Sequence, residues 1–405
     1  MTDPRTPVIV QVVPELSTGG TERTAIEISQ AVTMGGGEAF VISQGGRLER
    51  ELESAGGSLI RMRAASKNPA RIIGNAFAMA VAAQRRNASL LHARSRAPAW
   101  SARLAARRLG VPFVTTYHGV YNQRGRLKAW YNSVMASGDV VIANSDFTAR
   151  TVIERHGAAP ERVRVIHRGV DLARFSPEGV SDDRVRALAA RWLIAPGERV
   201  VLHAARLTKW KGQTLLIDAV AALGDAPEIA DVVFVLAGDA QGRTDYEHTL
   251  RERIAAHGLS GRFRLTGHCA DMPAAFKLAH VAVVSPLEPE AFGRVSVEAQ
   301  AMGRPVIGTQ IGAVGETLSV GERRTGWLTP PADPAALAQI LREVLAMPEE
   351  NLSVMRRNAM QHARERFSIE RMQINTLKIY DELLRSRLVD GFQARFTGER
   401  ALARA

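Results

Sequence analysis

Residues 281–309 constrain the fold most, because they combine two apolar runs with a helical segment between them. Val281–Val284 is fully apolar and predicts a buried strand, and Pro305–Gly308 predicts a second strand. A polar loop and a helix that begins near Gly293 lie between these runs. Strands joined through a helix in this way pair in parallel, so the stretch predicts an α/β fold.

The same alternation recurs along most of the chain. Further apolar runs are found at Val8–Val13, Ala39–Ser43, Ser58–Met62, Leu90–Ala93, Phe113–Tyr117, Asp139–Asn144, Arg199–Ala205, Val232–Ala237 and Phe263–Thr266. Helical patterns separate several of them, as in Ala70–Arg85 and Ala97–Leu109. We expect two Rossmann-like parallel-sheet domains, at 1–175 and 184–368, with Ser176–Asp183 as the linker. A long amphipathic helix at 369–390 follows, and we expect the polar tail after Asp390 to be loosely held.

Length and composition limit the class of protein. A chain of 405 residues with 46% apolar residues can form two hydrophobic cores. It contains no uncharged apolar stretch of the length that crosses a bilayer, and its N-terminus leads directly into a strand. Its single cysteine, Cys269, cannot form an internal disulfide, and no cluster with metal-ligand spacing is visible. We therefore expect a cytoplasmic protein without a metal.

The positive charge is concentrated in the first half of the chain. Residues 1–170 contain 23 Lys and Arg against 12 Asp and Glu, whereas the rest contains 30 against 29. Between Glu53 and Asp139 there are 14 basic residues and no acidic one. A field of this kind favours an anionic partner, such as a membrane surface, a phosphorylated acceptor or a nucleic acid.

The loop and helix after Val284 indicate an anion site flanked by carboxylates. The first N–H groups of a helix have no partner within the helix and attract phosphate. Glu290 precedes the helix and Glu298 lies more than a turn inside it, so both should face hydroxyl groups rather than phosphate. This arrangement suits a sugar nucleotide. The alternative is a βαβ unit of some other α/β protein with an accidental pair of glutamates.

Other strand ends carry residues that suit the same ligand. Arg206 and Lys211 follow a strand and could converge on a pyrophosphate, although an exposed basic loop would look similar. Gly19 and Gly20 would let the backbone approach a ligand, but they do not form the dinucleotide fingerprint. Two further glycines, Gly238 and Gly267, also end strands.

These motifs together resemble one known family. The spacing Glu290-x7-Glu298, the Gly19-Gly20-x-Glu22 loop and the Arg206-x4-Lys211 pair look like the motifs of the retaining glycosyltransferases of family 4. The segment from Gly169 to Phe175 is also similar to that family. Within it, the chain looks most like bacterial lipopolysaccharide and glycolipid glycosyltransferases.

The resemblance implies a GT-B fold, with two domains facing a cleft and the C-terminal helix crossing back to the first. It implies a nucleoside diphosphate sugar as donor, no cofactor and no obligatory metal. Catalytic roles would fall to His118, Arg206, Lys211 and Glu290. Donor-binding roles would fall to Gly19, Gly20, Gly238, Gly267, Phe292, Gly293, Arg294, Val295 and Glu298. In such enzymes the histidine lies against the donor sugar, and a carboxylate such as Glu298 binds the ribose.

The acceptor is expected from charge. Arg124, Arg126, Lys128 and Trp130 combine cations with an aromatic ring, as at a membrane interface. Arg103, Arg107 and Arg108 would lie on a neighbouring helix. The alternative is a solvated helix whose aromatic residues face the core. We expect an anionic glycolipid or a lipopolysaccharide core as acceptor, and a peripheral enzyme on the inner face of the cytoplasmic membrane.

Three other functions are alternatives to glycosyl transfer. A sugar-nucleotide epimerase shares the GT-B fold. A phosphorylase of this fold would need a pyridoxal-binding lysine, and the sequence does not single one out. A nucleic-acid-binding protein would explain the basic region, but it would leave Glu290 and Glu298 without a role, and no reader motif is recognisable.

Overall fold

The computed structural model describes residues 6–17, 19–119, 121, 125–242 and 244–402, with only the backbone of residues 398–402. The chain forms two compact units. Unit 1 comprises residues 1–168 and 369–405, and unit 2 comprises residues 169–368.

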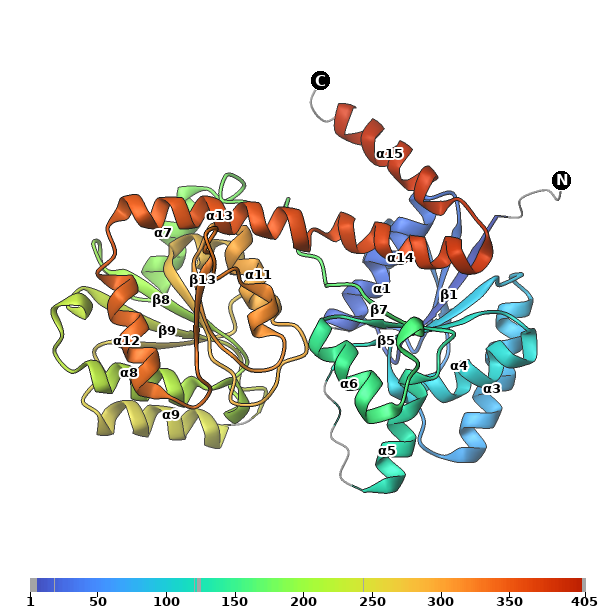
Figure 1. The fold of residues 1–405 in the computed structure, drawn as a ribbon, viewed down its shortest axis with the longest axis horizontal. Coiled ribbons are helices and arrows are strands. Elements are labelled where there is room, and N and C mark those ends of the chain that lie inside the picture. Colours follow the sequence, from blue (N-terminus) through green and yellow to red (C-terminus); the bar gives the residue numbers. More distant parts are fainter. Residues whose placement is uncertain (1–5, 18, 120, 122–124, 243, 403–405) are drawn as a thin grey trace. The chain divides into compact units, whose positions relative to one another are not determined.

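Unit 1 contains a seven-stranded sheet in the order β3–β2–β1–β4–β5–β6–β7 (Figure 1). Its strands are β1 Val8–Val12, β2 Glu38–Ser43, β3 Gly57–Arg61, β4 Leu90–Ala93, β5 Phe113–Tyr117, β6 Val140–Ala143 and β7 Val163–Val165. Every neighbouring pair is parallel. The central strands are fully buried, as expected for a sheet covered on both faces.

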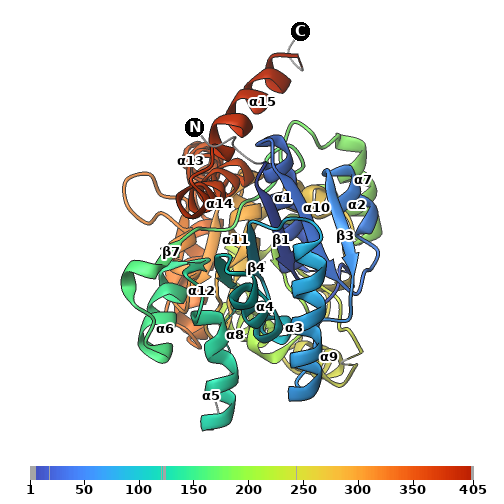
Figure 2. The ribbon, with the colours of Figure 1, turned by 90° about the vertical axis from the view of Figure 1, so that its right-hand side faces the viewer.

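Helices cover the two faces of this sheet. They are α1 Gly20–Met34, α2 Glu49–Ser54, α3 Pro69–Gln84, α4 Arg96–Leu109, α5 Arg126–Ser133, α6 Asp146–His156, α14 Ile369–Leu384 and α15 Leu388–Leu402. Ile9 packs in one cluster with α1, α14 and α15, whereas Val10 packs in another with α3 and α4. Successive strand residues point to opposite faces, so the two helix groups lie on opposite sides. Helices α3 and α4 lie side by side (Figure 2).

Unit 2 repeats this plan with a six-stranded parallel sheet in the order β10–β9–β8–β11–β12–β13. Its strands are β8 Arg199–Ala204, β9 Val232–Ala237, β10 Phe263–Gly267, β11 Ala279–Val284, β12 Val306–Thr309 and β13 Gly326–Thr329. Its helices are α7 Asp182–Arg191, α8 Gln213–Leu223, α9 Thr244–Ala256, α10 Met272–Leu278, α11 Arg294–Ala301, α12 Pro334–Leu345 and α13 Glu349–Phe367. None of the helices in the described ranges is both long enough and apolar enough to cross a bilayer.

Each sheet has one point at which the strand order reverses. In unit 1 it lies between β1 and β4, and in unit 2 it lies between β8 and β11. Open parallel sheets bind ligands beyond the carboxyl ends of the strands at this switch point. The prediction of two Rossmann-like parallel-sheet domains is confirmed.

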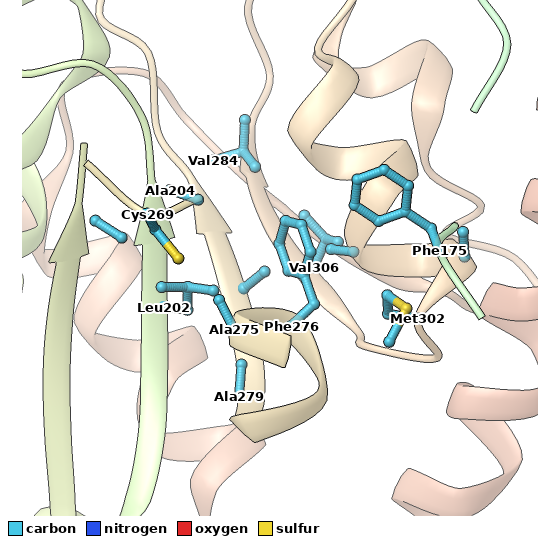
Figure 3. Packing of buried hydrophobic residues seen from close by; sticks show 14 of the residues in the cluster. Phe175, Leu202, Ala204, Cys269, Ala275, Phe276, Ala279, Val284, Met302 and Val306 are labelled. Carbon is cyan, nitrogen blue, oxygen red and sulfur yellow. The ribbon is translucent and has the colours of Figure 1, made fainter. Parts of the chain in front are cut away.

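The core of unit 2 on one face of its sheet is built around Phe276 of α10. Its ring lies 6.3 Å from that of Phe175, and Val306 and Met302 belong to the same cluster (Figure 3). Cys269 is buried at the edge of this cluster, and burial raises the pKa of its thiol. Helix and strand side chains therefore pack together in one close-packed core, which fixes the positions of the strands.

The boundary between the units differs from the expected one. The backbone N–H of Val170 donates to the carbonyl of Phe367 at 2.7 Å, and Val170 pairs with Ser368. With Phe175 in the core, these contacts assign residues 169–175 to unit 2. The expected linker also folds: Val180 is buried and α7 begins at Asp182.

The expectation of a loosely held C-terminal tail is wrong, because residues 388–402 form α15. Leu388 and Phe392 are buried in the cluster with α1. The carboxylate of Asp381 accepts hydrogen bonds from the N–H groups of Leu388 and Val389, at 2.8 and 3.0 Å, which satisfies the start of the helix. The sequence signal was the i, i+4, i+8 spacing of Leu388, Phe392 and Phe396.

Candidate active site

Lys211 and Glu290 form an ion pair at the switch point of unit 2. Nζ of Lys211 lies 2.7 Å from Oε1 of Glu290, and their side chains are only 13% and 17% exposed. Lys211 ends a short 3-10 turn, Lys209–Lys211, that follows β8, and Glu290 lies between β11 and α11. The structure thus joins a cation predicted to hold phosphate to a carboxylate predicted to hold sugar hydroxyls.

The position of Lys211 depends on the glycine that follows it. Gly212 has φ +73°, and a Cβ there would lie 1.9 Å from the carbonyl oxygen of Ser285. The hydroxyl of Ser285 donates to the Gly212 carbonyl at 3.2 Å, and the Leu287 N–H donates to the Trp210 carbonyl at 2.8 Å. The turn carrying Lys211 is therefore fixed to the loop that carries Glu290.

Glu290 is fixed by a second glycine that the sequence analysis did not identify. Its backbone pairs with Gly312, whose φ is +62°, and a Cβ on Gly312 would lie 2.5 Å from the N and O atoms of Glu290. The Ala313 N–H donates to the Glu290 carbonyl at 2.8 Å. Within the described residues, the buried Oε2 of Glu290 has no hydrogen-bond partner. This oxygen can accept a hydrogen bond from a ligand.

Helix α11 begins beside this pair, as expected from the sequence. Its first residue, Arg294, follows Gly293 at φ +90° and pairs with Glu298 at 3.2 Å. Val295 lines the pocket that contains Lys211 and Glu290.

Phe292, a predicted donor-binding residue, has a buried side chain. Its side chain is 3% exposed and packs edge-on against Phe367 at 5.7 Å. The side chain is part of the core of unit 2, so only its backbone remains for contact with a ligand.

His203 is a further residue of this pocket that sequence reasoning missed. It is 1% exposed, and its Nε2 donates to the Lys211 carbonyl at 3.1 Å, because a carbonyl only accepts. Its Nδ1 is buried and has no partner in the described part of the chain. Burial lowers the pKa of His203 to about 4, so the ring is neutral near pH 7. The available signal was a polar residue inside an apolar strand.

The other predicted site residues of unit 2, the catalytic Arg206 and the donor-binding Gly238 and Gly267, lie at or just after strand ends. Arg206 is exposed, and its guanidinium donates to the side-chain oxygen of Gln241 at 3.4 Å rather than to Glu290. Gly238 follows β9, and a Cβ there would lie 1.8 Å from the carbonyl oxygen of Ala205. Gly267 ends β10 with φ +67° in open space.

In unit 1, His118 follows β5. The guanidinium of Arg168 donates to its Nδ1 at 2.8 Å, and the amide of Asn144 donates to its carbonyl oxygen at 3.4 Å. Burial, with the charges of Arg168 and Arg94, lowers the pKa of His118 well below its usual range. Gly19 and Gly20 form the start of α1, so they lie at a positive helix end.

The residues proposed for acceptor contact lie on α4 and α5. Arg126, Lys128, Arg107 and Arg108 are exposed, and Arg103 is half-buried. Trp130 is 62% exposed and stacks on Trp100 with ring centres 4.6 Å apart. The ring is therefore available at the surface. Arg124 lies outside the described residues.

Comparison with known proteins agrees with this geometry. Residues 18–174 match the family described as Glycosyltransferase Family 4, and residues 186–362 match Glycosyl transferases group 1. The glycosyltransferase from Rickettsia africae ESF-5 is 31% identical, over 94% of this chain and 99% of that one, with a TM-score of 0.86. The chain belongs to the family 4 glycosyltransferases of the GT-B fold class, and it is an enzyme.

Two further relatives refine the comparison. The D-inositol 3-phosphate glycosyltransferase of Salinispora tropica is 35% identical over 312 residues, which are 71% of this chain. The chain spans 63% of that relative's length. HepE from Anabaena, solved with UDP and glucose, is 23% identical over 93% of this chain and all of that one, with a TM-score of 0.78. This last similarity is one of fold.

Proposed function

We propose that this enzyme transfers a sugar from a nucleoside diphosphate sugar to an acceptor and retains the anomeric configuration. The observation that carries the proposal is the Lys211–Glu290 ion pair beside the start of α11. A diphosphate carries more charge than one carboxylate, so it would replace Glu290 as the partner of Lys211. Glu290 would then be free to accept hydrogen bonds from the hydroxyls of the sugar.

The chain's own charges can stabilise the leaving group. As the bond from the anomeric carbon to the phosphate oxygen breaks, negative charge grows on the diphosphate. Lys211, Arg206 and the N–H groups at the start of α11 are the groups that would meet this charge, and preorganised donors of this kind lower the barrier. Glu298 would bind the ribose hydroxyls. We therefore propose a reaction that needs no metal.

Retention requires either a double displacement or a front-face substitution. A double displacement needs a carboxylate beside the anomeric carbon. The pocket lined by His118 has no Asp or Glu among its described lining residues. The low pKa of His118 also leaves the ring neutral. We favour front-face substitution, in which the leaving phosphate takes the proton of the acceptor hydroxyl.

For the acceptor, we favour a compound that carries a phosphate group. The names of relatives such as the Salinispora tropica enzyme support a phosphorylated polyol. The excess of basic residues in 1–170 favours any anionic acceptor, including the glycolipid or lipopolysaccharide core expected from the sequence.

A specific surface favours a membrane-bound acceptor as the second candidate. On α3, Ile73, Phe77 and Val81 are 64%, 55% and 37% exposed, and their spacing places them on one helix face. Leu104 on α4 and Leu127 on α5 are also exposed. Arg108 lies 4.4 Å from the centre of the Phe77 ring, and residues 54–138 contain 14 basic residues and no acidic one. Apolar side chains bordered by cations alone suit the surface of an anionic bilayer.

Transfer is tested by incubating the enzyme with UDP-, GDP- and ADP-sugars and a polyol phosphate, with and without EDTA. NMR of the product gives the anomeric configuration. The expected result is transfer from one nucleotide class, with retention, that EDTA does not abolish. An inverted product would contradict the mechanism, and loss of activity in EDTA that Mg²⁺ restores would contradict the metal-free reaction.

The membrane candidate is tested by flotation with anionic and with neutral vesicles at low and high salt. We expect binding to anionic vesicles alone and release in salt, because surface charges are screened. Phe77→Ser should weaken this binding. Leu193→Ser, which removes an apolar side chain that is 74% exposed in unit 2, is the matched control. Equal loss in both variants, or no binding by the wild type, would exclude this surface.

A further inference from the structure

Unit 1 contains a small polar pocket at its own switch point. Arg94 follows β4, Thr116 is the second-last residue of β5 and Asn144 follows β6, and all three line the pocket. The other polar residues that line it are Thr24, His118, Arg168 and Thr376. All of these residues belong to unit 1, so the pocket is defined within a single compact unit.

Arg94 is the unusual residue of this pocket. It is 2% exposed, and its Nε donates to Oε1 of Gln11 at 2.5 Å. The amide nitrogen of Gln11 donates in turn to the Ala25 carbonyl at 2.8 Å and to the Ser29 hydroxyl at 2.9 Å. Gln11 therefore holds the guanidinium in one orientation without neutralising its charge.

One nitrogen of the guanidinium is left without a hydrogen-bond partner. Nη2 of Arg94 is buried and has no hydrogen-bond partner among the residues that the structure describes. No ion pair to Arg94 occurs within the described ranges. Burial lowers the pKa of Arg94, and the charges of Tyr380 and Glu27 and a hydrogen bond with the Tyr380 hydroxyl oppose this lowering. A buried, unpaired cation costs several kcal/mol, so such groups are normally matched by an anion.

His118 contributes a second unused donor to the same pocket. An arginine side chain only donates, so Nδ1 of His118 accepts from Arg168. A neutral imidazole then carries its proton on Nε2. This buried nitrogen also has no partner in the described part of the chain. Two donors without acceptors thus line a pocket whose described lining contains no carboxylate.

We propose that this pocket binds one oxyanion group of a substrate, a phosphate or a carboxylate, through Nη2 of Arg94. The proposal rests on the proposed glycosyl transfer only for the identity of the substrate. Two sources share this chemistry: the phosphate of a phosphorylated acceptor and the carboxylate of an acidic donor sugar. The planar guanidinium can bind either group through parallel N–H donors.

Binding of inorganic phosphate, measured by isothermal titration calorimetry, tests the site without any turnover. Arg94→Met should weaken phosphate binding about 10- to 100-fold, which is the effect of losing a charged hydrogen bond. Lys211→Ala is the control, because it removes the phosphate-binding cation of unit 2. It should change the affinity of this site by less than about twofold. Equal affinity in the wild type and Arg94→Met would overturn the proposal.

Two further measurements guard against loss of the fold in Arg94→Met. Arg94→Lys keeps the charge and loses the fork, so it should bind phosphate more weakly than the wild type and more tightly than Arg94→Met. Crystals of the wild type soaked in tungstate should show anomalous density next to Arg94. Tungstate density found only elsewhere would overturn the site even if both variants failed to fold.

Paired substrates identify the source of the oxyanion. A polyol phosphate is compared with the free polyol as acceptor, and a uronic acid nucleotide with its neutral hexose counterpart as donor. Arg94→Met should abolish the preference for the charged member of one pair, by about tenfold or more in kcat/KM, and leave the other pair unchanged. If both preferences are unchanged, the pocket does not bind a substrate. Activity that fails while phosphate still binds at Arg94 would count against the proposed function alone.

Discussion

The switch points of the two units have the same strand topology and opposite electrostatics. In unit 2, the cation of Lys211 is already paired with Glu290 at 2.7 Å. In unit 1, the cation of Arg94 is held by a neutral amide and has no carboxylate partner among the described residues. An anion that binds in unit 2 must therefore displace Glu290 from Lys211. An anion that binds in unit 1 would instead supply the acceptor that Nη2 of Arg94 lacks. We expect unit 2 to select ligands that compete with Glu290 for Lys211, and unit 1 to select ligands that carry a negative charge.

The largest expected effect follows from removing the Lys211 cation from its ion pair in unit 2. Lys211→Ala leaves the Glu290 carboxylate with little solvent and no cation, and it removes the charge that would meet the leaving diphosphate. Turnover should fall on the order of 100-fold or more. Initial rates with a saturating sugar nucleotide measure this, and Lys209→Ala, in the same turn but exposed, is the control. Near-normal turnover of Lys211→Ala would show that the pair is not the phosphate site.

The next effect concerns the geometry of the pair rather than its charge. Gly312→Ala places a Cβ 2.5 Å from the backbone of Glu290 at a φ of +62°, so the loop must move. We expect a loss of about 1–3 kcal/mol in the free energy of unfolding. Urea unfolding gives this value. Gly321→Ala, at an exposed position with open space around it, should change it by less than about 0.5 kcal/mol. Equal stability of the two variants would contradict the contact.

Acid should destabilise unit 2 through His203. Its pKa is 6.5 in the unfolded chain and about 4 in the folded one, so the unfolded state binds more protons between these values. The free energy of unfolding should fall as the pH drops from 6.5 to 4, by at most about 1.4 kcal/mol per pH unit from this residue. Urea unfolding across this range should give a shallower slope for His203→Gln. An unchanged slope would mean that His203 titrates normally in the folded state.

The smallest effect separates the roles of the two glutamates of unit 2. Glu298→Ala should weaken binding of the bare nucleoside diphosphate by about tenfold or less, since one or two neutral hydrogen bonds to the ribose are lost. Glu290→Gln should instead slow transfer more than it weakens that binding. Calorimetry with the nucleotide and initial rates give both values. Unchanged nucleotide affinity in Glu298→Ala would contradict the ribose role.

The fold was predictable from the sequence because buried parallel strands consist of short runs of apolar residues. Leu90–Ala93 and Phe113–Tyr117 are strands with the expected bounds. The ion pair between Lys211 and Glu290 was not predicted, because both residues had been assigned to ligand groups rather than to one another. The burial of Phe292 was missed for a related reason. A motif fixes the position of a residue along the chain, and packing against a distant residue such as Phe367 decides where its side chain points.

Arg94 and His203 escaped for another reason. Arg94 follows an apolar strand, so the sequence places it in a loop, and only the structure shows that it is buried. His203 lies inside an apolar strand, and its hydrogen-bond partner cannot be deduced from that position. The tail was misjudged because its composition is polar, although the spacing of Leu388 and Phe392 is that of a packed helix. Local sequence patterns therefore predicted where the strands end. They did not predict which groups each buried polar side chain contacts, because those groups lie far away along the chain.

The discontinuity of unit 1 has a consequence for how the protein is made. Unit 2 is one continuous segment, 169–368, whereas unit 1 needs residues 369–405 from the end of the chain. Gln373 of α14 donates to the Glu27 carbonyl of α1 at 2.7 Å, and Leu388 and Phe392 cover the same helix. During synthesis, unit 1 cannot finish folding until α14 and α15 have left the ribosome, because they cover an apolar face of α1. Unit 2 can complete its core before unit 1 does, although most of unit 1 is translated earlier. A ribosome that stalls once unit 2 has emerged would therefore present a nascent chain in which unit 2 is folded and unit 1 exposes apolar surface to chaperones.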